Sequence, residues 1–329
     1  MGMRLRKRIV TIGGGTGHFT VLSALRDSGH DLSAIVSMAD DGGSTGVLRT
    51  ELGVLPPGDV RQCLVALSRS SVLLQKLFTY RFDGGRFVGA HFGNLFLSAM
   101  EKITGDFDAA VQHTGELLAI EGSVIPVTTE DVTLYAQCDG ETRIRGEAQI
   151  DKTTLSKDVQ LFLDPTPRVN PRAQIALADA NLVIIGPGDI YTSIVPNLLV
   201  AGMPEAIRAS RGKKIYVANL MNKPNHAARF HVASYVEILE RFLGAGVLDA
   251  VLYNTEAPSN AMCEAYARAD ETPVGIDDVG FDKFPYSRIG VPLLARTVTT
   301  TQDPHDPLVR TLIRHDREKL CRALLSCLP

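Results

Sequence analysis

The feature that most constrains the fold is the glycine-rich turn Gly13-Gly14-Gly15-Thr16-Gly17, which separates a short β-rich run from a helical segment. Residues 8–12 (RIVTI) are typical of a short strand, and residues 19–25 are typical of a helix. Residues 32–38 (LSAIVSM) are typical of a buried strand. A strand, a glycine turn, a helix and a second strand form a βαβ unit, which predicts an α/β fold with a parallel sheet.

Strands and helices continue to alternate further along the chain. Helical patterns dominate residues 58–119, and residues 181–185, 214–218 and 249–253 have the composition of strands. Each of these strands ends at polar or glycine residues, and ligands of open α/β sheets bind at such carboxyl ends. Apolar residues at helical spacing in 307–325 predict a closing helix.

One segment, at about 124–163, departs from this alternation. Residues 132–136 and 143–147 flank Asp139-Gly140, and a dipeptide of this kind between two β-rich runs is a strong hairpin signal. We therefore expect an antiparallel β-hairpin insertion within a single domain that spans residues 1–329.

Composition excludes several classes of protein. The formal net charge of −3 provides no basic field for a nucleic-acid partner. The five cysteines are scattered without C-x-x-C spacing, which argues against a zinc site or a disulfide framework. No stretch approaches the roughly 20 apolar residues that a membrane span needs, and the basic start lacks the apolar region of a signal peptide. We expect a cytoplasmic protein, and a homodimer because two-fold dimers are the commonest oligomers.

The first glycine turn lies where a phosphate-binding loop belongs, after the first strand and before a helix. Glycine lets the backbone approach a phosphate, and the helix start offers free N–H groups. His18 replaces the third glycine of the dinucleotide fingerprint, and no Lys-Ser/Thr pair follows as in a Walker A loop. A purely structural turn remains an alternative, although its position favours phosphate binding.

Several polar motifs are further candidates, each with a structural alternative. Asp40-Asp41-Gly42-Gly43-Ser44 follows the second strand, where a ribose-binding or metal-binding acid is expected, but an Asx-type turn explains it equally well. Asp59 follows a Pro-Pro-Gly turn and is explained by helix capping. His91 and Asn94 frame a glycine, and a lone histidine is more often a packed residue. Gly186-Pro187-Gly188-Asp189, with Tyr191 and Thr192, forms a second glycine turn and a second candidate anion site.

In this order the motifs resemble those of one family, that of the gluconeogenesis factor and the 2-phospho-L-lactate transferase. Each motif alone is weak, but six in the family's order are specific and cover nearly the whole chain. The matching segments are Gly13 to Gly17, Asp40 to Ser44, Pro56-Pro57-Gly58-Asp59, Phe92-Gly93-Asn94-Leu95, Gly186-Pro187-Gly188 with Tyr191-Thr192-Ser193, and Asn219-Leu220-Met221.

The resemblance implies a Rossmann-like α/β fold of three layers, with a mostly parallel sheet and the ligand across its carboxyl edge. One branch of the family is a cytoplasmic factor that binds UDP-sugars and supports cell shape and wall synthesis during gluconeogenic growth. The other is a magnesium-dependent enzyme that transfers a phospholactyl group to the deazaflavin precursor Fo in coenzyme F420 biosynthesis. The ligand expected by resemblance is thus a nucleotide, and Mg²⁺ is an option under the second branch.

The first branch is favoured by three segments. Residues 48–53 resemble its L-R-x-E-L-G run, residues 313–316 resemble its C-terminal pattern, and Tyr266 matches an aromatic position. The resemblance places Tyr266 and Arg314 near the nucleotide or its diphosphate, although a packing tyrosine and a surface arginine would explain them equally well. The candidate ligand-binding residues are Gly14, Gly15, Thr16, Gly17, Asp40, Asp41, Gly42, Gly43, Ser44, Asp59, His91, Asn94, Gly186, Pro187, Gly188, Asp189, Tyr191, Thr192, Asn219, Tyr266 and Arg314.

Two segments depart from the family's pattern. Asp189 stands where the family usually has serine, and a carboxylate there would repel a phosphate unless a cation or a ribose hydroxyl intervenes. Residues 222–226 (NKPNH) replace the usual T-Q-P-G-E-T run. We therefore keep the transferase as an alternative, with Asp40, Asp41 or Asp59 as metal ligand, and assign no catalytic residue and no firm metal site. A third alternative is a protein that binds an NAD-like ligand, such as an oxidoreductase, but His18 in place of the third glycine of the dinucleotide fingerprint argues against it.

Overall fold

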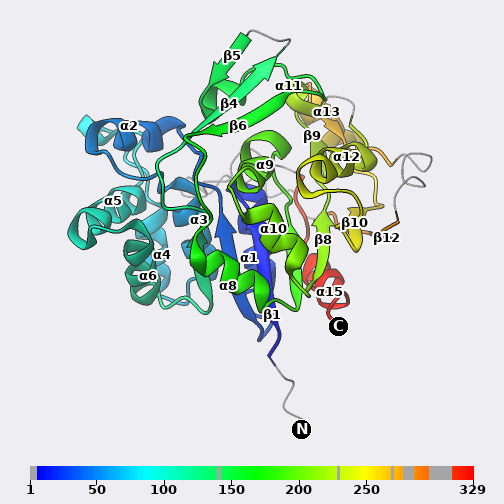
Figure 1. The fold of residues 1–329 in the computed structure, drawn as a ribbon, viewed down its shortest axis with the longest axis horizontal. Helices are drawn as coiled ribbons and strands as arrows, with labels where there is room; N and C mark the ends of the chain where they lie inside the picture. The colour runs from blue at the N-terminus through cyan, green and yellow to red at the C-terminus, as the bar shows by residue number, and fades with distance from the viewer. Residues whose placement is uncertain (1–5, 139–141, 228–229, 268–269, 277–284, 296–312) are drawn as a thin grey trace.

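The centre of the computed structural model is a seven-stranded sheet (Figure 1). The structure describes residues 6–138, 142–227, 230–267, 270–276, 285–295 and 313–329. The strand order is β12-β10-β8-β7-β1-β2-β3, and every neighbouring pair is parallel. The strands are β1 (Arg8–Gly13), β2 (Asp31–Val36), β3 (Ser123–Pro126), β7 (Leu182–Ile185), β8 (Lys213–Val217), β10 (Ala250–Asn254) and β12 (Ser287–Val291).

The strand order reverses between β1 and β7, and this position fixes where a ligand can bind. The chain winds outward from β1 through β2 to β3, then returns to place β7 on the other side of β1. Ile12 of β1 pairs with Ile185 of β7, so the two strands end side by side at the same edge. The predicted Rossmann-like architecture is confirmed.

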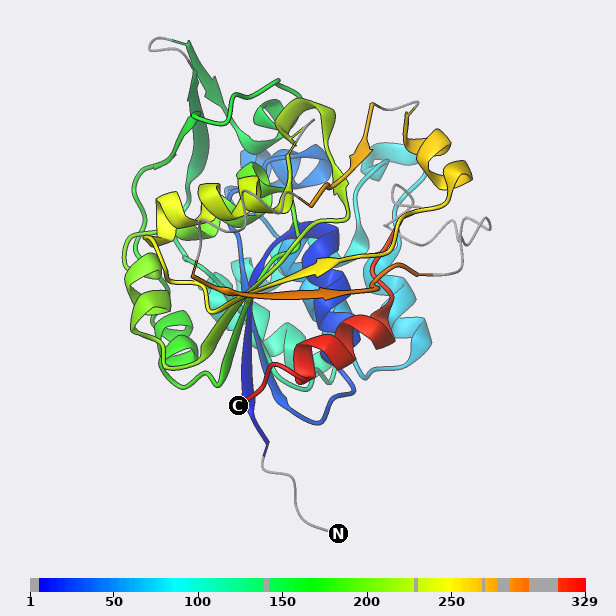
Figure 2. The same ribbon diagram turned by 90° about the vertical axis from the view of Figure 1, so that its right-hand side faces the viewer.

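Helices cover both faces of the sheet, which confirms the three layers (Figure 2). One face carries α1 (Gly15–Leu25), α3 (Gly58–Leu67) and α15 (Arg317–Leu325). The opposite face carries α8 (Pro171–Ala178), α9 (Val195–Leu198), α10 (Met203–Ala209) and α12 (Val232–Leu243). The helical stretch predicted at 58–119 consists of α3, α4 (Val72–Thr79), the short 3-10 helix η1 (Gly85–Phe87), α5 (Phe92–Thr104) and α6 (Phe107–Leu117).

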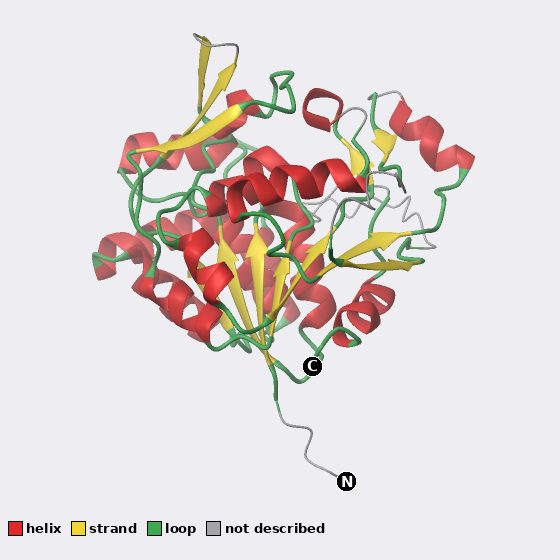
Figure 3. Cartoon of the chain, turned by 45° about the vertical axis from the view of Figure 1, so that its right-hand side comes forward, coloured by secondary structure: helices red, strands yellow, loops and turns green. Residues whose placement is uncertain are grey.

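The predicted insertion is a small antiparallel sheet beyond the carboxyl edge of the main sheet (Figure 3). It pairs β4 (Thr133–Cys138) with β5 (Thr142–Arg145) and with β6 (Gln160–Asp164). Asp139 and Gly140 lie outside the described residues. The insertion starts later than we predicted, because residues 124–126 belong to β3, which pairs with β2 in the main sheet.

The remaining elements are short and surround the carboxyl edge. They are α2 (Gly43–Leu52), α7 (Glu147–Ile150), the π-helical turn η2 (Ile190–Ile194), α11 (Pro224–Ala227), α13 (Asn260–Ala267), and the antiparallel pair β9 (Met221–Asn222) and β11 (Thr272–Pro273).

The C-terminal helix is shorter than predicted. Residues 307–312 lie outside the described residues, and the helix begins only at Arg317. Asp316 ends the extended segment before it, because its carboxylate accepts the backbone N–H of Lys319 as an N-cap. The packing of α15 against α1 agrees with the prediction of a closing helix. Within the described part of the chain, no helix has the length and apolar composition needed to cross a membrane.

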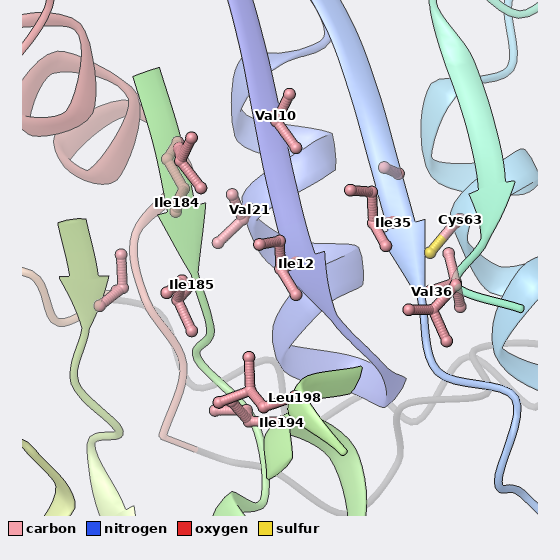
Figure 4. Close-up of a cluster of buried hydrophobic side chains, with 14 of the residues drawn as sticks. Val10, Ile12, Val21, Ile35, Val36, Cys63, Ile184, Ile185, Ile194 and Leu198 are labelled. Atoms are coloured by element: carbon pink, nitrogen blue, oxygen red, sulfur yellow. The ribbon is translucent and has the colours of Figure 1, made fainter. Parts of the chain in front are cut away.

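The core explains why the central strands β1 and β7 are mostly apolar. Val10 and Ile12 of β1 and Ile184 and Ile185 of β7 are almost fully buried, because helices cover the sheet on both sides. Val21 of α1 and side chains of η2 and α9 fill the two layers around them (Figure 4). This packing holds the ends of β1 and β7 at fixed positions.

Candidate functional site

Two glycine turns meet at the point where the strand order reverses. The first, Gly13–Gly17, follows β1, and the second, Gly186–Gly188, follows β7. A Cβ added to Gly17 would lie 2.2 Å from the carbonyl oxygen of Pro187, so only glycine permits this approach. Ligands of open α/β sheets bind in the crevice at such a switch point.

The backbone of the first turn is suited to an anion. Gly15 has a φ of +60°, in the left-handed region that glycine adopts at low cost. Gly14 is the N-cap of α1, and having no side chain it provides no capping oxygen. The backbone N–H groups at the start of α1 are thus not capped by a residue of their own helix, and the helix dipole is positive at this end.

Asn219, two residues after the end of β8, holds the second turn. Its Nδ2 donates to the carbonyl oxygen of Gly188 at 2.8 Å, and its Oδ1 accepts from the N–H of Gly188 at 3.0 Å. Gly186 has a φ of +73°, which explains the glycine at this tight bend.

A cleft of about 580 Å³ opens along the two turns. Its volume is typical of small-molecule sites, which span roughly 300–1,000 Å³. The predicted residues that line it are Gly14, Gly15, Thr16, Gly17, Pro187, Gly188, Asp189, Thr192, Asn219 and Arg314. The other predicted residues do not line this cleft: Asp40, Asp41, Gly42, Gly43, Ser44, Asp59, His91, Asn94, Gly186, Tyr191 and Tyr266.

Three carboxyl groups, of Asp40, Asp59 and Glu147, form an acidic group beside the first turn. A Cβ added to Gly14 would lie 2.5 Å from Asp59 Oδ2, and Asp59 accepts the N–H of Gly15. Burial, and then the charge of Asp40, raises the pKa of Asp59 to about 7 and that of Glu147 to about 9. Burial also raises the pKa of Asp40. The acidic group therefore does not carry three full charges at neutral pH.

Residues 40–44, the polar motif predicted after the second strand, make local structural contacts. Asp40 Oδ1 accepts the N–H of Gly42 at 2.9 Å, the Asx-type turn of the alternative interpretation. Asp41 Oδ1 accepts the N–H of Ala148 at 2.8 Å and so fixes the start of α7. Gly42 is the N-cap of α2, and Gly43 and Ser44 form its first residues.

His91 and Asn94 gather around the buried Arg61 and not around the cleft. Arg61 Nε donates to Asn94 Oδ1 at 2.8 Å, and Asn94 Nδ2 donates to Ser44 Oγ at 3.4 Å. Burial, and then the charge of Arg61, lowers the pKa of His91 to about 4, so its ring is neutral. These contacts are consistent with a packed histidine.

Tyr191 and Tyr266 are buried behind the cleft. The hydroxyl of Tyr191 donates to the carbonyl oxygen of Ser156 at 3.4 Å. The hydroxyl of Tyr266 accepts the N–H of Ile313 at 2.8 Å, directly before Arg314 in the sequence. Tyr266 thereby positions the segment that brings Arg314 into the cleft.

Asp189 is paired with cations from the segment that departs from the family's pattern. His226 Nδ1 lies 2.9 Å and Lys223 Nζ 3.2 Å from Asp189 Oδ2. Asp151, Asp189 and His226 also offer ligand atoms within 4.8 Å of one another, as a metal site would. The ammonium group of Lys223 already pairs with two of these three residues, because it also lies 2.6 Å from Asp151 Oδ1.

Several charged residues of the cleft were not among our candidates: Glu147, Asp151, Lys223, His226 and Glu271. Glu147 and Asp151 come from the region of the insertion, and Lys223 and His226 from the segment after β8. The signal in the sequence for Lys223 and His226 is the departure of residues 222–226 from the family's pattern.

Comparisons with known proteins agree with the resemblance. The family model described as 2-phospho-L-lactate transferase CofD matches residues 9–295. A protein of Nostoc sp., whose name includes the words gluconeogenesis factor, is 41% identical over 97% of this chain and 68% of its own length. The gluconeogenesis factor of Bacillus subtilis is 34% identical over 99% of each chain. The crystal structure of a UPF0052 family member from Bacillus halodurans matches with a TM-score of 0.89 and 33% identity, covering 98% of this chain and 100% of the other.

Proposed function

Because this chain belongs to the family of the gluconeogenesis factors and the 2-phospho-L-lactate transferase CofD, we propose that it binds a nucleotide sugar of the UDP type. In this proposal the protein is a cytoplasmic homodimer that supports cell shape and wall synthesis during growth on gluconeogenic carbon sources. Its action is binding, with the ligand lying across the carboxyl edge of the sheet.

The observation that carries this proposal is the contact between the two glycine turns at the switch point. Gly17 and Pro187 are so close that both turns form one wall of the same cleft. Backbone N–H groups at a helix start bind phosphate oxygens, and Arg314 adds a cation that can pair with a phosphate. This arrangement suits a diphosphate, with the nucleoside and the sugar extending to either side.

Calorimetric titration tests the proposal directly. We expect heat and a saturable isotherm with UDP-N-acetylglucosamine or UDP-glucose, and little with NAD, because His18 replaces the third glycine of the dinucleotide fingerprint. Circular dichroism verifies that the same sample is folded. A folded protein that gives no heat with either UDP-sugar at millimolar concentration would rule the proposal out.

The acidic group favours a second candidate, a Mg²⁺-dependent phospholactyl transferase of coenzyme F420 biosynthesis. Mg²⁺ is commonly held by one or two carboxylates together with waters and phosphate oxygens. Asp40 and Asp59 fit this role, because they lie beside the first glycine turn, and burial together with the charge of Asp40 raises the pKa of Asp59, which a bound cation would offset. When bound, Mg²⁺ would neutralise charge on the transferred phosphoryl group.

The two candidates differ in a simple assay. The transferase predicts turnover of Fo and the guanylyl-activated lactate in the presence of Mg²⁺, with loss of turnover in Asp59→Asn. Absence of turnover in wild-type protein that binds UDP-sugars would exclude the second candidate.

A further inference from the structure

Asp189 places a carboxylate inside the cleft, at the end of the second glycine turn. Its side chain is only 7% exposed. Its Oδ1 accepts the backbone N–H groups of Tyr191 and Thr192, both at 3.0 Å. Its Oδ2 faces His226 Nδ1 and Lys223 Nζ. A carboxylate has about four acceptor positions, so Asp189 has no position left for a sugar hydroxyl or a metal ion.

The His226 ring is held as a cation by its two neighbours. Its side chain is 1% exposed, Nδ1 faces the Asp189 carboxylate, and Nε2 lies 2.9 Å from the carbonyl oxygen of Ile150. Both partners are acceptors, so both ring nitrogens carry protons. Burial alone would lower the pKa of His226, but the hydrogen bond to Asp189 and its charge raise it.

Lys223 differs from His226 because part of it remains open to the cleft. Its ammonium group donates to Asp151 Oδ1 at 2.6 Å and pairs with Asp189 Oδ2, while its side chain is 45% exposed. An ammonium group has three N–H donors, and these two carboxylates use two of them. The third donor is available to a ligand in the cleft that Lys223 lines.

From this geometry we propose that Lys223 binds a phosphate group of the ligand, and that Asp189 and Asp151 hold its ammonium group in place. The proposal rests on the proposed function for the identity of the ligand as a nucleotide. The two carboxylates balance the charges of Lys223 and His226, so the cluster as a whole is neutral. An incoming phosphate thus meets an oriented ammonium group, and Asp189 is shielded from it.

A charge-removing substitution with a matched control provides the test. Lys157→Gln is the control, because Lys157 has similar exposure (42%), pairs with Glu237 and does not line the cleft. We expect Lys223→Gln to weaken binding of UDP-N-acetylglucosamine and of inorganic diphosphate by about tenfold or more. Uridine, which has no phosphate, should bind Lys223→Gln and wild type equally, and Lys157→Gln should bind all three ligands normally. Equal losses for uridine and UDP-N-acetylglucosamine, or no loss at all, would overturn the proposal.

A double substitution separates phosphate binding from mere neutralisation of Asp189. Serine at 189 keeps a capping oxygen for the N–H groups of η2 but removes the charge. If Lys223 binds phosphate, Asp189→Ser/Lys223→Gln binds inorganic diphosphate more weakly than Asp189→Ser does, because only the single variant keeps the ammonium group. If Lys223 only neutralises Asp189, the double variant regains the affinity of wild type, and the proposal is wrong. Chemical denaturation of each variant verifies that it is folded.

Failure of the proposed function can be told apart from failure of this inference. Wild-type protein that binds inorganic diphosphate but no UDP-sugar contradicts the proposed function, and the comparison of Lys223→Gln with wild type still decides the role of Lys223. Wild-type protein that binds neither ligand contradicts both.

Discussion

Replacing Gly17 by alanine should separate the two glycine turns and so test the geometry on which the proposed site depends. Gly17 lies in the first turn of α1 and has an ordinary helical backbone, so an added methyl group strains no dihedral angle. The new Cβ would lie 2.2 Å from the oxygen and 2.6 Å from the carbon of the Pro187 carbonyl group. Both contacts are with backbone, which cannot rotate away as a side chain can.

The expected magnitude follows from two opposing effects. Restoring van der Waals separation requires the turns to move apart by about 1 Å or more, and overpacking of this kind costs about 1–3 kcal/mol. Alanine in a helix is favoured over glycine by about 0.5–1 kcal/mol, so we expect a net loss of roughly 1–2 kcal/mol of unfolding free energy. A displaced turn also loses at least one hydrogen bond to a charged phosphate, about 1.5–3 kcal/mol, which weakens affinity by about tenfold or more.

Guanidinium denaturation measures the first effect and calorimetry with UDP-N-acetylglucosamine the second. Gly84→Ala is the control, because no heavy atom lies within 4 Å of its added Cβ and its φ of −153° is extended. The control should match wild type in both measurements. If Gly17→Ala were more stable than wild type and bound the ligand equally well, the turns would not be in contact and our account of the site would be refuted.

Three further predictions concern the surroundings of the turns. Burial lowers the pKa of His18 to about 3, so the ring is neutral in the folded protein. The free energy of unfolding of wild type, relative to that of His18→Gln, should therefore be largest above about pH 6.5 and should decrease as the pH falls toward 3, by up to about 1.4 kcal/mol per pH unit. Urea denaturation at several pH values measures this difference. Burial raises the pKa of Glu147 to about 9, so Glu147→Gln should become more stable relative to wild type as the pH rises from about 4.5 to 9; equal differences at pH 5 and pH 8 would contradict this. Asn219→Ala should lose about 1–3 kcal/mol of stability and weaken UDP-sugar binding, because both hydrogen bonds to Gly188 disappear. Gln160→Ala is the control and should stay near wild type, because Gln160 does not line the cleft and loses one long bond to the carbonyl oxygen of Asp158.

Local sequence patterns were sufficient to predict the parallel sheet and the positions of both turns. Strands β1 and β7 are largely apolar because helices cover both of their faces, and the glycines at the end of each strand mark its carboxyl end. Strand β12 (Ser287–Val291) was missed because it lies at the sheet edge, where exposed residues replace the apolar run. The boundary of the insertion was misplaced for a related reason: β3 has only four residues, and nothing local distinguishes it from the strands that follow.

The residues that line the cleft were harder to predict, because segments that are distant in the sequence come together there. Glu147 and Asp151 reach the site from the region of the insertion, and their sequence neighbours show no ligand-binding pattern. His18 is a different case, since it marked a departure from the dinucleotide fingerprint. The structure gives that departure a physical role: the buried ring packs beneath Gly13 and contacts the Thr11 hydroxyl at 2.7 Å.

The two departures from the family's pattern meet in space and are best understood as one change. Asp189 alone would repel a phosphate, and Lys223 and His226 alone would leave two positive charges beside the second turn. Together they form an ion-paired cluster, with the Asp189 carboxylate between His226 and Lys223. Removal of His226 leaves the buried Asp189 carboxylate with the partly exposed ammonium group of Lys223 but without its buried partner, and a buried charge that loses a partner is costly. It follows that His226→Ala alone should destabilise the protein more than Asp189→Ser/His226→Ala does, and a double variant no more stable than the single one would show that the two segments are not coupled.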